Sequence, residues 1–171
     1  MHLPPDFAVS EIDLPNFHAV SPGIYRGGQP SDMGFAWLKQ LGVRTILNLR
    51  EEKSQIRSEE LIVLELGMKY VSVVLNPFIE PSEEQIQSCL DVLLAAGDEP
   101  VFVHCLHGMD RTGTVIGAHR MVAEDWEKER AYEEMLKHGF HAEFANLTRA
   151  IEGIASRVAR AKSVPVSELE I

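Results

Sequence analysis

Residues 101–114 read Val-Phe-Val-His-Cys-Leu-His-Gly-Met-Asp-Arg-Thr-Gly-Thr. The apolar run that ends at His104 predicts a buried strand, and the stretch from Arg111 to Ala123 predicts a helix. A short loop that contains Gly108 separates the two. This order predicts a cradle for an anion, because the N–H groups of the loop and the positive end of the helix dipole converge on one point.

The residues at the two ends of this loop indicate which anion it binds. Cys105 and Arg111 are six positions apart, a spacing that lets the loop amides surround the oxygens of a phosphoryl group. Gly108 permits a close approach of the backbone, and Arg111 can hold two oxygens in a bidentate fork. Cys105 would then lie in line for attack on phosphorus, as the thiolate that such surroundings favour. Thr112 can donate its hydroxyl to the sulfur and assist its departure.

Outside this segment, short apolar runs alternate with stretches of helical periodicity. The runs around Thr45 and Val101 are almost continuously apolar, which suits a parallel sheet that is covered on both faces. We therefore expect a single α/β domain with a central, mostly parallel sheet of roughly four to five strands and helices on both faces. The expected strands are 23–26, 44–49, 69–75 and 100–104, and the expected helices are 31–41, 58–66, 82–96, 111–123, 127–138 and 143–162.

Local signals set the limits of several elements and of the domain. Ser31 and Gly42 are typical of the two ends of a helix, and Ser82 with Gln85 forms a capping box. Prolines in residues 1–22 predict an extended segment that lies over the surface of a domain spanning 23–162. Residues 163–171 are expected to form a frayed tail.

The overall composition excludes several classes of protein. The chain has 171 residues, of which 45% are hydrophobic and 25% charged, as expected for one globular domain. Its net charge of −10 argues against binding to nucleic acid. No apolar run reaches the length of an integral membrane segment, and only two cysteines, Cys89 and Cys105, indicate a reducing cytoplasmic compartment. The oligomeric state stays open.

The run from His104 to Gly113 resembles the signature of the cysteine-dependent tyrosine and dual-specificity phosphatases, which is His-Cys, five residues, Arg and then Ser or Thr. Residues 23–30 and 41–50 also resemble the small atypical dual-specificity group. The resemblance implies a two-step hydrolysis of phosphomonoesters through a cysteinyl-phosphate, without a metal or other cofactor. It implies Cys105 as nucleophile and Arg111 as phosphate clamp. It further implies that the substrate phosphate binds to Leu106, His107, Gly108, Met109, Asp110 and Arg111.

In the region that commonly supplies the general acid, this sequence departs from the pattern of these phosphatases. Many relatives supply an Asp about thirty residues before the cysteine, but residues 73–83 contain none and offer Asn76 and Glu80 instead. Asp110, inside the loop, resembles the arrangement in myotubularins and certain bacterial tyrosine phosphatases. The negative charges of thiolate and phosphate would favour its protonated form, so that it could donate a proton first and accept one later. We therefore prefer Asp110 over Glu80, although Asp110 could instead cap the helix.

Three functions remain in competition. The first is a phosphatase for phosphotyrosine, with phosphoserine and phosphothreonine as further substrates. The second is a phosphoinositide or inositol-phosphate phosphatase with the same loop. It is disfavoured because neither His107 nor Met109 is a Lys or Arg. The third is a catalytically silent phospho-binding module, against which Cys105, Arg111 and Thr112 argue.

A zinc site at the histidines beside Cys105 lacks further ligands at suitable spacing. Cys89 is interpreted as a core residue, with a redox disulfide to Cys105 as the alternative.

Overall fold

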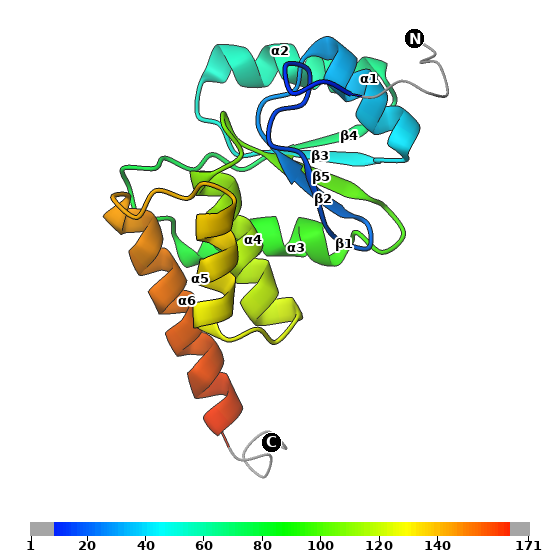
Figure 1. Ribbon diagram of the computed structural model, residues 1–171. Coiled ribbons are helices and arrows are strands. Elements are labelled where there is room, and N and C mark those ends of the chain that lie inside the picture. The colour runs from blue at the N-terminus through cyan, green and yellow to red at the C-terminus, as the bar shows by residue number, and fades with distance from the viewer. Residues whose placement is uncertain (1–8, 165–171) are drawn as a thin grey trace.

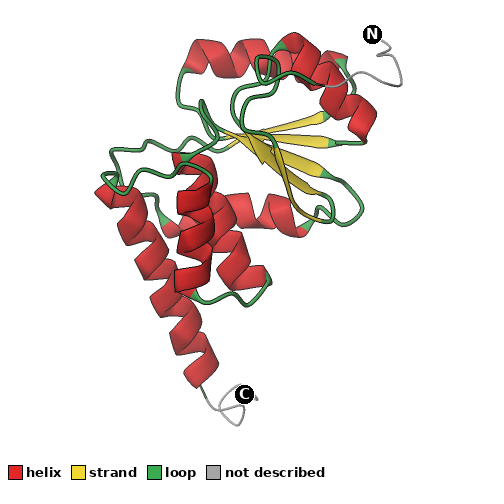
Figure 2. Cartoon of the chain, in the orientation of Figure 1, coloured by secondary structure: helices red, strands yellow, loops and turns green. Residues whose placement is uncertain are grey.

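A five-stranded sheet forms the middle layer of the molecule (Figure 2). The computed structural model describes residues 9–164, and its strands pair in the order β1-β2-β5-β3-β4. β1 runs antiparallel to β2, whereas the three other pairs are parallel, as expected from the apolar strands. The strands are β1 (His18–Ser21), β2 (Ile24–Gly27), β3 (Thr45–Asn48), β4 (Lys69–Ser72) and β5 (Val101–His104).

Helices cover both faces of the sheet, which confirms the expected fold class (Figure 1). α1 (Asp32–Leu41) and α2 (Lys53–Glu65) lie on one face, and α3 (Glu83–Leu94) and α4 (Asp110–Ala123) lie on the other. α5 (Lys128–Lys137) and α6 (Ala145–Ser163) extend this second layer, and both pack against α4. None of the helices within residues 9–164 is long and apolar enough to cross a membrane.

Successive side chains of β5 point alternately to the two helical layers on either side of the sheet. Phe102 packs into the core beneath α1 and α2, together with residues such as Phe35. Val103 packs into the other core, which α3 and α4 complete, and Cys105 belongs to that same cluster. Successive residues at the end of the strand therefore face opposite layers: His104 approaches Phe35, whereas Cys105 lies on the α4 side.

Two helices, α1 and α3, begin at the capping residues that the sequence predicts. The side chain of Ser31 accepts a hydrogen bond from the N–H of Gly34, and Ser82 forms the expected capping box with Gln85. α2, however, begins at Lys53, five residues before its expected start at residue 58. The side chain of its N-cap, Glu52, forms no capping hydrogen bond, so the sequence has no preferred capping residue that would mark the beginning of α2.

The N-terminal segment contributes a buried side chain and an edge strand to the domain, and does not only lie over its surface as expected. Residues 1–8 lie outside the described part of the chain, but Leu14 is only 1% exposed and β1 forms an edge of the sheet. The sequence analysis did not predict β1, because this polar edge strand lacks an apolar run. Ser163 is the last residue of α6, and residues 165–171 of the expected tail are not described. The domain limits 23–162 stay a prediction.

We predict that Gly34→Ala lowers the free energy of unfolding by about 1–3 kcal/mol, as overpacking does elsewhere. A Cβ atom on Gly34 would lie 2.2 Å from the carbonyl oxygen of Asp13, and that oxygen already accepts the N–H of Ser31. Gly97→Ala is the matched control, because its Cβ would meet nothing within 4 Å. Urea unfolding of both variants measures the difference, and equal stabilities would contradict this account.

Candidate active site

The loop between β5 and α4 is held from behind by its carbonyl groups. The ring of His104 lies 3.0 Å from the carbonyl oxygen of Cys105, and the N–H of Gln29 donates to the next carbonyl, that of Leu106, at 2.9 Å. The side-chain amide of Asn16 contacts the carbonyls of His107 and Gly108, at 3.5 and 3.2 Å. Arg26 also donates to Gly108, at 3.0 Å. Every carbonyl from Cys105 to Gly108 thus has a partner in the surrounding scaffold.

The direction of these carbonyls determines where the loop amides point. In a planar trans peptide, the N–H of the next residue points opposite to the carbonyl. The N–H groups of residues 106–109 therefore turn away from the scaffold and toward the concave side of the loop. Gly108 has a φ of +72°, and a Cβ there would lie 2.4 Å from the backbone of Gly27. Only glycine fits both requirements, which explains its place in the loop.

Cys105 and Arg111 lie at the two ends of this concave loop. Cys105 is 3% exposed, and the Arg111 side chain reaches the carbonyl of Leu75 at 3.4 Å and the carboxylate of Glu51 at 3.9 Å. These contacts hold the guanidinium beside the loop before any phosphate binds. The hydroxyl of Thr112 is buried and has no hydrogen-bond partner in the described part of the chain. It is therefore available to a thiolate or another acceptor within the loop.

A buried pair between His104 and Glu59 supports the loop from the α2 side. Nε2 of His104 lies 2.6 Å from Oε1 of Glu59, and the two side chains are 0% and 2% exposed. The other carboxylate oxygen of Glu59 accepts hydrogen bonds from the amides of Gln29 and Gln55. Both ring nitrogens of His104 therefore lie within hydrogen-bond distance of an oxygen, one on Glu59 and the other on the backbone of Cys105.

Asp110 is bonded to a residue that the sequence analysis did not single out. Its Oδ1 accepts the backbone N–H of His141 at 2.7 Å, and Nδ1 of the His141 ring lies 3.1 Å from both carboxylate oxygens. Asp110 is the first residue of α4 and not its N-cap, which is Met109, so the alternative capping role is wrong. No local pattern links Asp110 and His141, which are 31 residues apart.

The segment 76–81 lies where many relatives carry their acid. The carbonyl of Phe78 accepts a hydrogen bond from Asn146 at 2.6 Å, and the ring of Phe78 packs on that of Phe144, with centroids 5.6 Å apart. Glu80, the alternative acid, points to α6, where Arg149 lies 3.4 Å from its carboxylate. The segment is thus tied to the beginning of α6 (Figure 1).

A second polar cluster lies beneath the loop. Burial lowers the pKa of Arg26 to about 10, while the negative charges of Glu134 and Cys105 act in the opposite direction. The Arg26 side chain also donates to the loop carbonyl of Gly108, as described above. The rings of His18 and His138 pack nearby, with centroids 4.3 Å apart. Burial and the charge of Arg26 lower the pKa of both histidines, that of His138 to about 4.

The remaining expected residues divide between the loop and the core. Leu106 and His107 are exposed on the loop, whereas Met109 packs against Gly139. Cys89 is fully buried in the core cluster that also contains Cys105, and burial raises the pKa of its thiol to about 12. Both cysteines are free, and Cys89 fits its expected role as a core residue.

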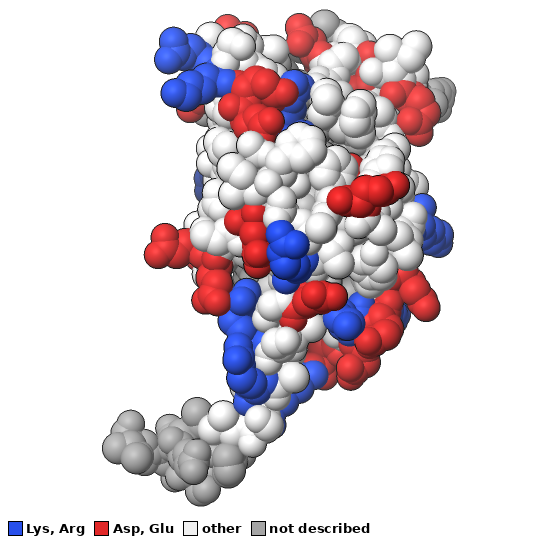
Figure 3. All heavy atoms as spheres, turned by 90° about the vertical axis from the view of Figure 1, so that its left-hand side faces the viewer, with Lys and Arg blue, Asp and Glu red and all other residues white. Residues whose placement is uncertain are grey.

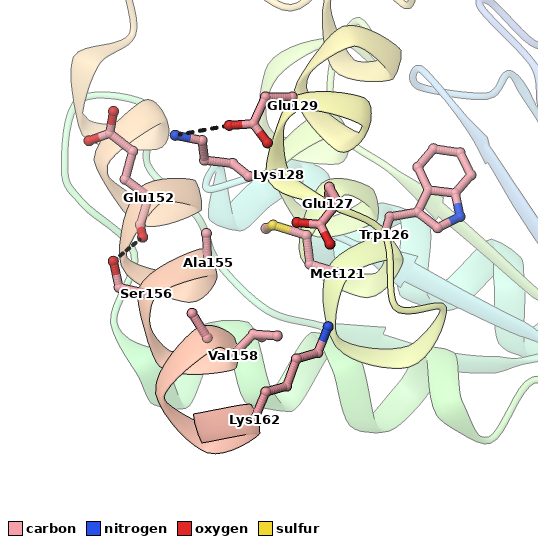
Figure 4. Close-up of a pocket in the computed structure, with 11 residues that line it drawn as sticks. Met121, Trp126, Glu127, Lys128, Glu129, Glu152, Ala155, Ser156, Val158 and Lys162 are labelled. Atoms are coloured by element: carbon pink, nitrogen blue, oxygen red, sulfur yellow. Dashed lines mark hydrogen bonds and ion pairs between the residues drawn. The ribbon is translucent and has the colours of Figure 1, made fainter. Parts of the chain in front are cut away.

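Two hollows differ in their relation to the loop. One of about 340 Å³ is lined by Glu51, Val74, Asn76, Ile79, Pro81 and Gln85, and Glu51 connects it to Arg111. A groove of about 510 Å³ lies instead between α6 and the start of α5, where Trp126, Lys128 and Lys162 line it (Figure 4). None of the residues that line this groove belongs to the loop 105–111. The smaller hollow is therefore the better candidate for a substrate.

A cysteine and an arginine at the ends of such a loop, at the carboxyl edge of a mostly parallel sheet, define the class of cysteine-dependent phosphatase domains. Residues 9–149 match the family described as "DSP-PTPase phosphatase fused to NAD+ Kinase". The chain therefore belongs to this family of dual-specificity-type phosphatase domains. This confirms the resemblance that the loop signature indicated.

Individual relatives agree with the family assignment. The dual specificity protein phosphatase TpbA of Pseudomonas aeruginosa (strain UCBPP-PA14) is 33% identical over 128 residues, which cover 73% of this chain and 55% of TpbA. Inositol diphosphatase DSP4 of Arabidopsis thaliana is 31% identical over 113 residues, covering 63% of this chain and 56% of DSP4. The crystal structure of P. aeruginosa TpbA has a TM-score of 0.70 at 24% identity, over 89% of this chain and 94% of that chain. The chain spans about half the length of TpbA and of DSP4.

We predict that Glu59→Gln lowers the free energy of unfolding by ~3–5 kcal/mol, because removing one member of a buried pair leaves the other charge uncompensated. Glu60→Gln is the matched control, since Glu60 is the next residue along α2 and is exposed. Chemical denaturation compares the two variants. A loss in Glu59→Gln no larger than in Glu60→Gln would show that the Glu59–His104 pair does not support the loop.

We also predict that stability falls between about pH 7.5 and about pH 5.5, partly through His138. The folded protein holds the pKa of His138 at about 4, below its usual 6.5, so the unfolded chain takes up a proton first and unfolding becomes easier as the pH falls. His138→Gln should make this fall in melting temperature smaller. The exposed His107 provides the control variant His107→Gln, which should retain the full fall. Identical pH dependences in wild type and His138→Gln would contradict the assignment.

Proposed function

We propose that the protein is a metal-independent phosphatase that hydrolyses phosphomonoesters through a cysteinyl-phosphate. The carbonyls of residues 105–108, all tied outward, are the observation that carries this proposal, because they turn the loop amides toward a single site above Cys105. Aligned N–H groups and Arg111 stabilise the charge on the oxygens of the phosphoryl group while it is being transferred. Membership of a phosphatase family supports the same activity.

In the first step, the thiolate of Cys105 attacks phosphorus while the bond to the leaving oxygen breaks. The leaving oxygen takes the electron pair of that bond together with a proton from Asp110. In the second step, water attacks phosphorus, Asp110 takes a proton from this water, and the S–P bond breaks. Thr112, whose hydroxyl is buried without a partner among the described residues, donates to the departing sulfur, and inorganic phosphate leaves.

Phosphotyrosine fits the surroundings of the loop best. Ile79, which lines the hollow that Glu51 connects to Arg111, is 64% exposed, and the adjacent Phe78 is 73% exposed. These two side chains suit a ring. No Lys or Arg lines this hollow, whereas Glu51 does. Figure 3 shows a broad uncharged area on one side of the molecule, with acidic and basic groups both above and below it. In the hollow beside Glu51, a polyphosphorylated ring would leave several anionic groups without cationic partners.

An inositol-phosphate phosphatase is the second candidate. The relative DSP4 is named an inositol diphosphatase, and the same loop would serve that reaction. A phosphorylated protein and a free small phosphoester both present one phosphoryl group to the loop, so both belong to the proposed substrate class. We place the activity in the cytoplasm, because both described cysteines are free thiols and Cys105 has to remain reduced to react.

Cys105→Ser should abolish turnover of p-nitrophenyl phosphate while the folded protein still binds phosphate. Serine keeps the loop but is a far weaker nucleophile than a thiolate. The assay compares the wild type and this variant on p-nitrophenyl phosphate, a phosphotyrosine peptide, a phosphoserine peptide and inositol phosphates. We expect the aryl phosphates to be hydrolysed fastest. Preference for inositol phosphates would support the second candidate, and no turnover of any ester by the wild type would leave only a binding role.

A further inference from the structure

Asp110 and His141 form a pair at the rim of the loop, held by the tertiary fold. Both N–H groups of His141 that reach Asp110, the backbone amide and Nδ1, meet the same carboxylate. The Asp110 side chain is 15% exposed and that of His141 is 55% exposed, so the outer side of the ring is open to water. Asp110 is thus nearly enclosed, while its partner connects it to the solvent.

Few charged groups surround this pair. Arg111, the next residue of α4, turns toward the carbonyl of Leu75 and Glu51. On the side of α6, the ring of Phe144 lies edge-on to His141, with centroids 6.2 Å apart. Arg149 of α6 is paired with Glu80, and Glu143 is exposed in the connecting segment. Asp110 is the acidic partner of His141 among the ion pairs of residues 9–164.

The two hydrogen bonds create a difficulty for Asp110 as an acid. A carboxylate that accepts N–H bonds is favoured in its ionised form, yet the leaving oxygen requires a proton. An imidazolium at His141 resolves this difficulty, because its Nδ1 proton lies within one hydrogen bond of either carboxylate oxygen. When a phosphate dianion enters the loop beside Asp110, like-charge repulsion favours transfer of that proton from nitrogen to oxygen.

We propose that His141 is a positioning residue that stores the proton which Asp110 delivers to the leaving group. Before reaction, Nδ1 holds the proton and Asp110 is ionised. With substrate bound, the proton moves to Asp110, and the ring stays neutral with its remaining proton on Nε2. Asp110 passes the proton to the leaving oxygen, and in the second step it takes a proton from water and returns it to Nδ1. No proton is gained or lost over the cycle other than those of water and the phosphate products.

This proposal rests on the proposed phosphatase function and adds a prediction of its own. Two coupled groups release their shared proton as a unit, at a higher pH than an isolated carboxyl would. Activity should therefore persist toward neutral pH with His141 present and decline at lower pH without it. The effect should be greatest for substrates whose leaving oxygen needs a proton.

The test measures kcat against pH for the wild type, His141→Gln and Asp110→Asn, with phenyl phosphate and with 2,4-dinitrophenyl phosphate. We expect His141→Gln to lower kcat for phenyl phosphate roughly 10- to 100-fold near neutral pH and to move the basic limb down by about one pH unit or more. The dinitrophenyl ester, whose leaving group needs no proton, should lose far less. Asp110→Asn should remove the limb altogether.

Glu143→Gln is the matched control, because it changes an exposed ionisable group in the same connecting segment. A fall in kcat of His141→Gln that is equal at every pH and for both esters would show a purely structural role and overturn the proposal. NMR titration of the His141 ring without substrate gives a second readout: Asp110→Asn should lower the midpoint, and an unchanged midpoint also overturns it. Failure of the wild type on every ester would instead overturn the phosphatase function, so the two failures are distinguishable.

Discussion

The site depends on the way in which the scaffold holds the carbonyl groups of residues 105–108. A loop that presents several N–H groups to one anion is intrinsically unstable, because its aligned dipoles repel each other when the anion is absent. Asn16, Arg26 and Gln29 offset this cost by donating to the carbonyls from behind, and the ring of His104 lies against the carbonyl of Cys105. The surface that we propose for anion binding is therefore preorganised, so a substrate would not bear the cost of ordering it.

The charge of the whole protein and the charge at the site have opposite signs. The chain carries a net charge of −10, yet the buried guanidiniums of Arg26 and Arg111 converge on one loop. Burial weakens water's screening of these charges, so their effect on a bound phosphate exceeds that of the distant acidic surface. Glu51 lies 3.9 Å from Arg111, and the negative charge of Glu134 acts on Arg26, so both carboxylates limit the cost of burying these cations. Local arrangement, and not net charge, therefore decides what this loop binds.

The sequence predicted the parts whose information is local. The spacing of Cys105, Gly108 and Arg111 between an apolar strand and a helix defined the loop, and the caps at Ser31 and Ser82 defined two helices. The partners of that loop could not be predicted in this way. Glu59 and His141 meet their partners only across 45 and 31 residues of chain, and nothing in their neighbours distinguishes them from surface residues. Edge strand β1 was missed for a related reason, since half-exposed residues carry no apolar pattern.

The hydrogen bonds of the Asn16 side chain have a consequence for the order in which the chain folds. Its amide joins the carbonyls of Gly108 and His138, which follow it by 92 and 122 residues. Contacts between residues so far apart in the sequence form only after the intervening chain has collapsed, because closing a long loop costs conformational entropy. In a nascent chain the Asn16 contacts therefore form only after α5, which ends next to His138, has been synthesised. The catalytic loop would then become active last, after Asn16 and α5 have both docked on the domain.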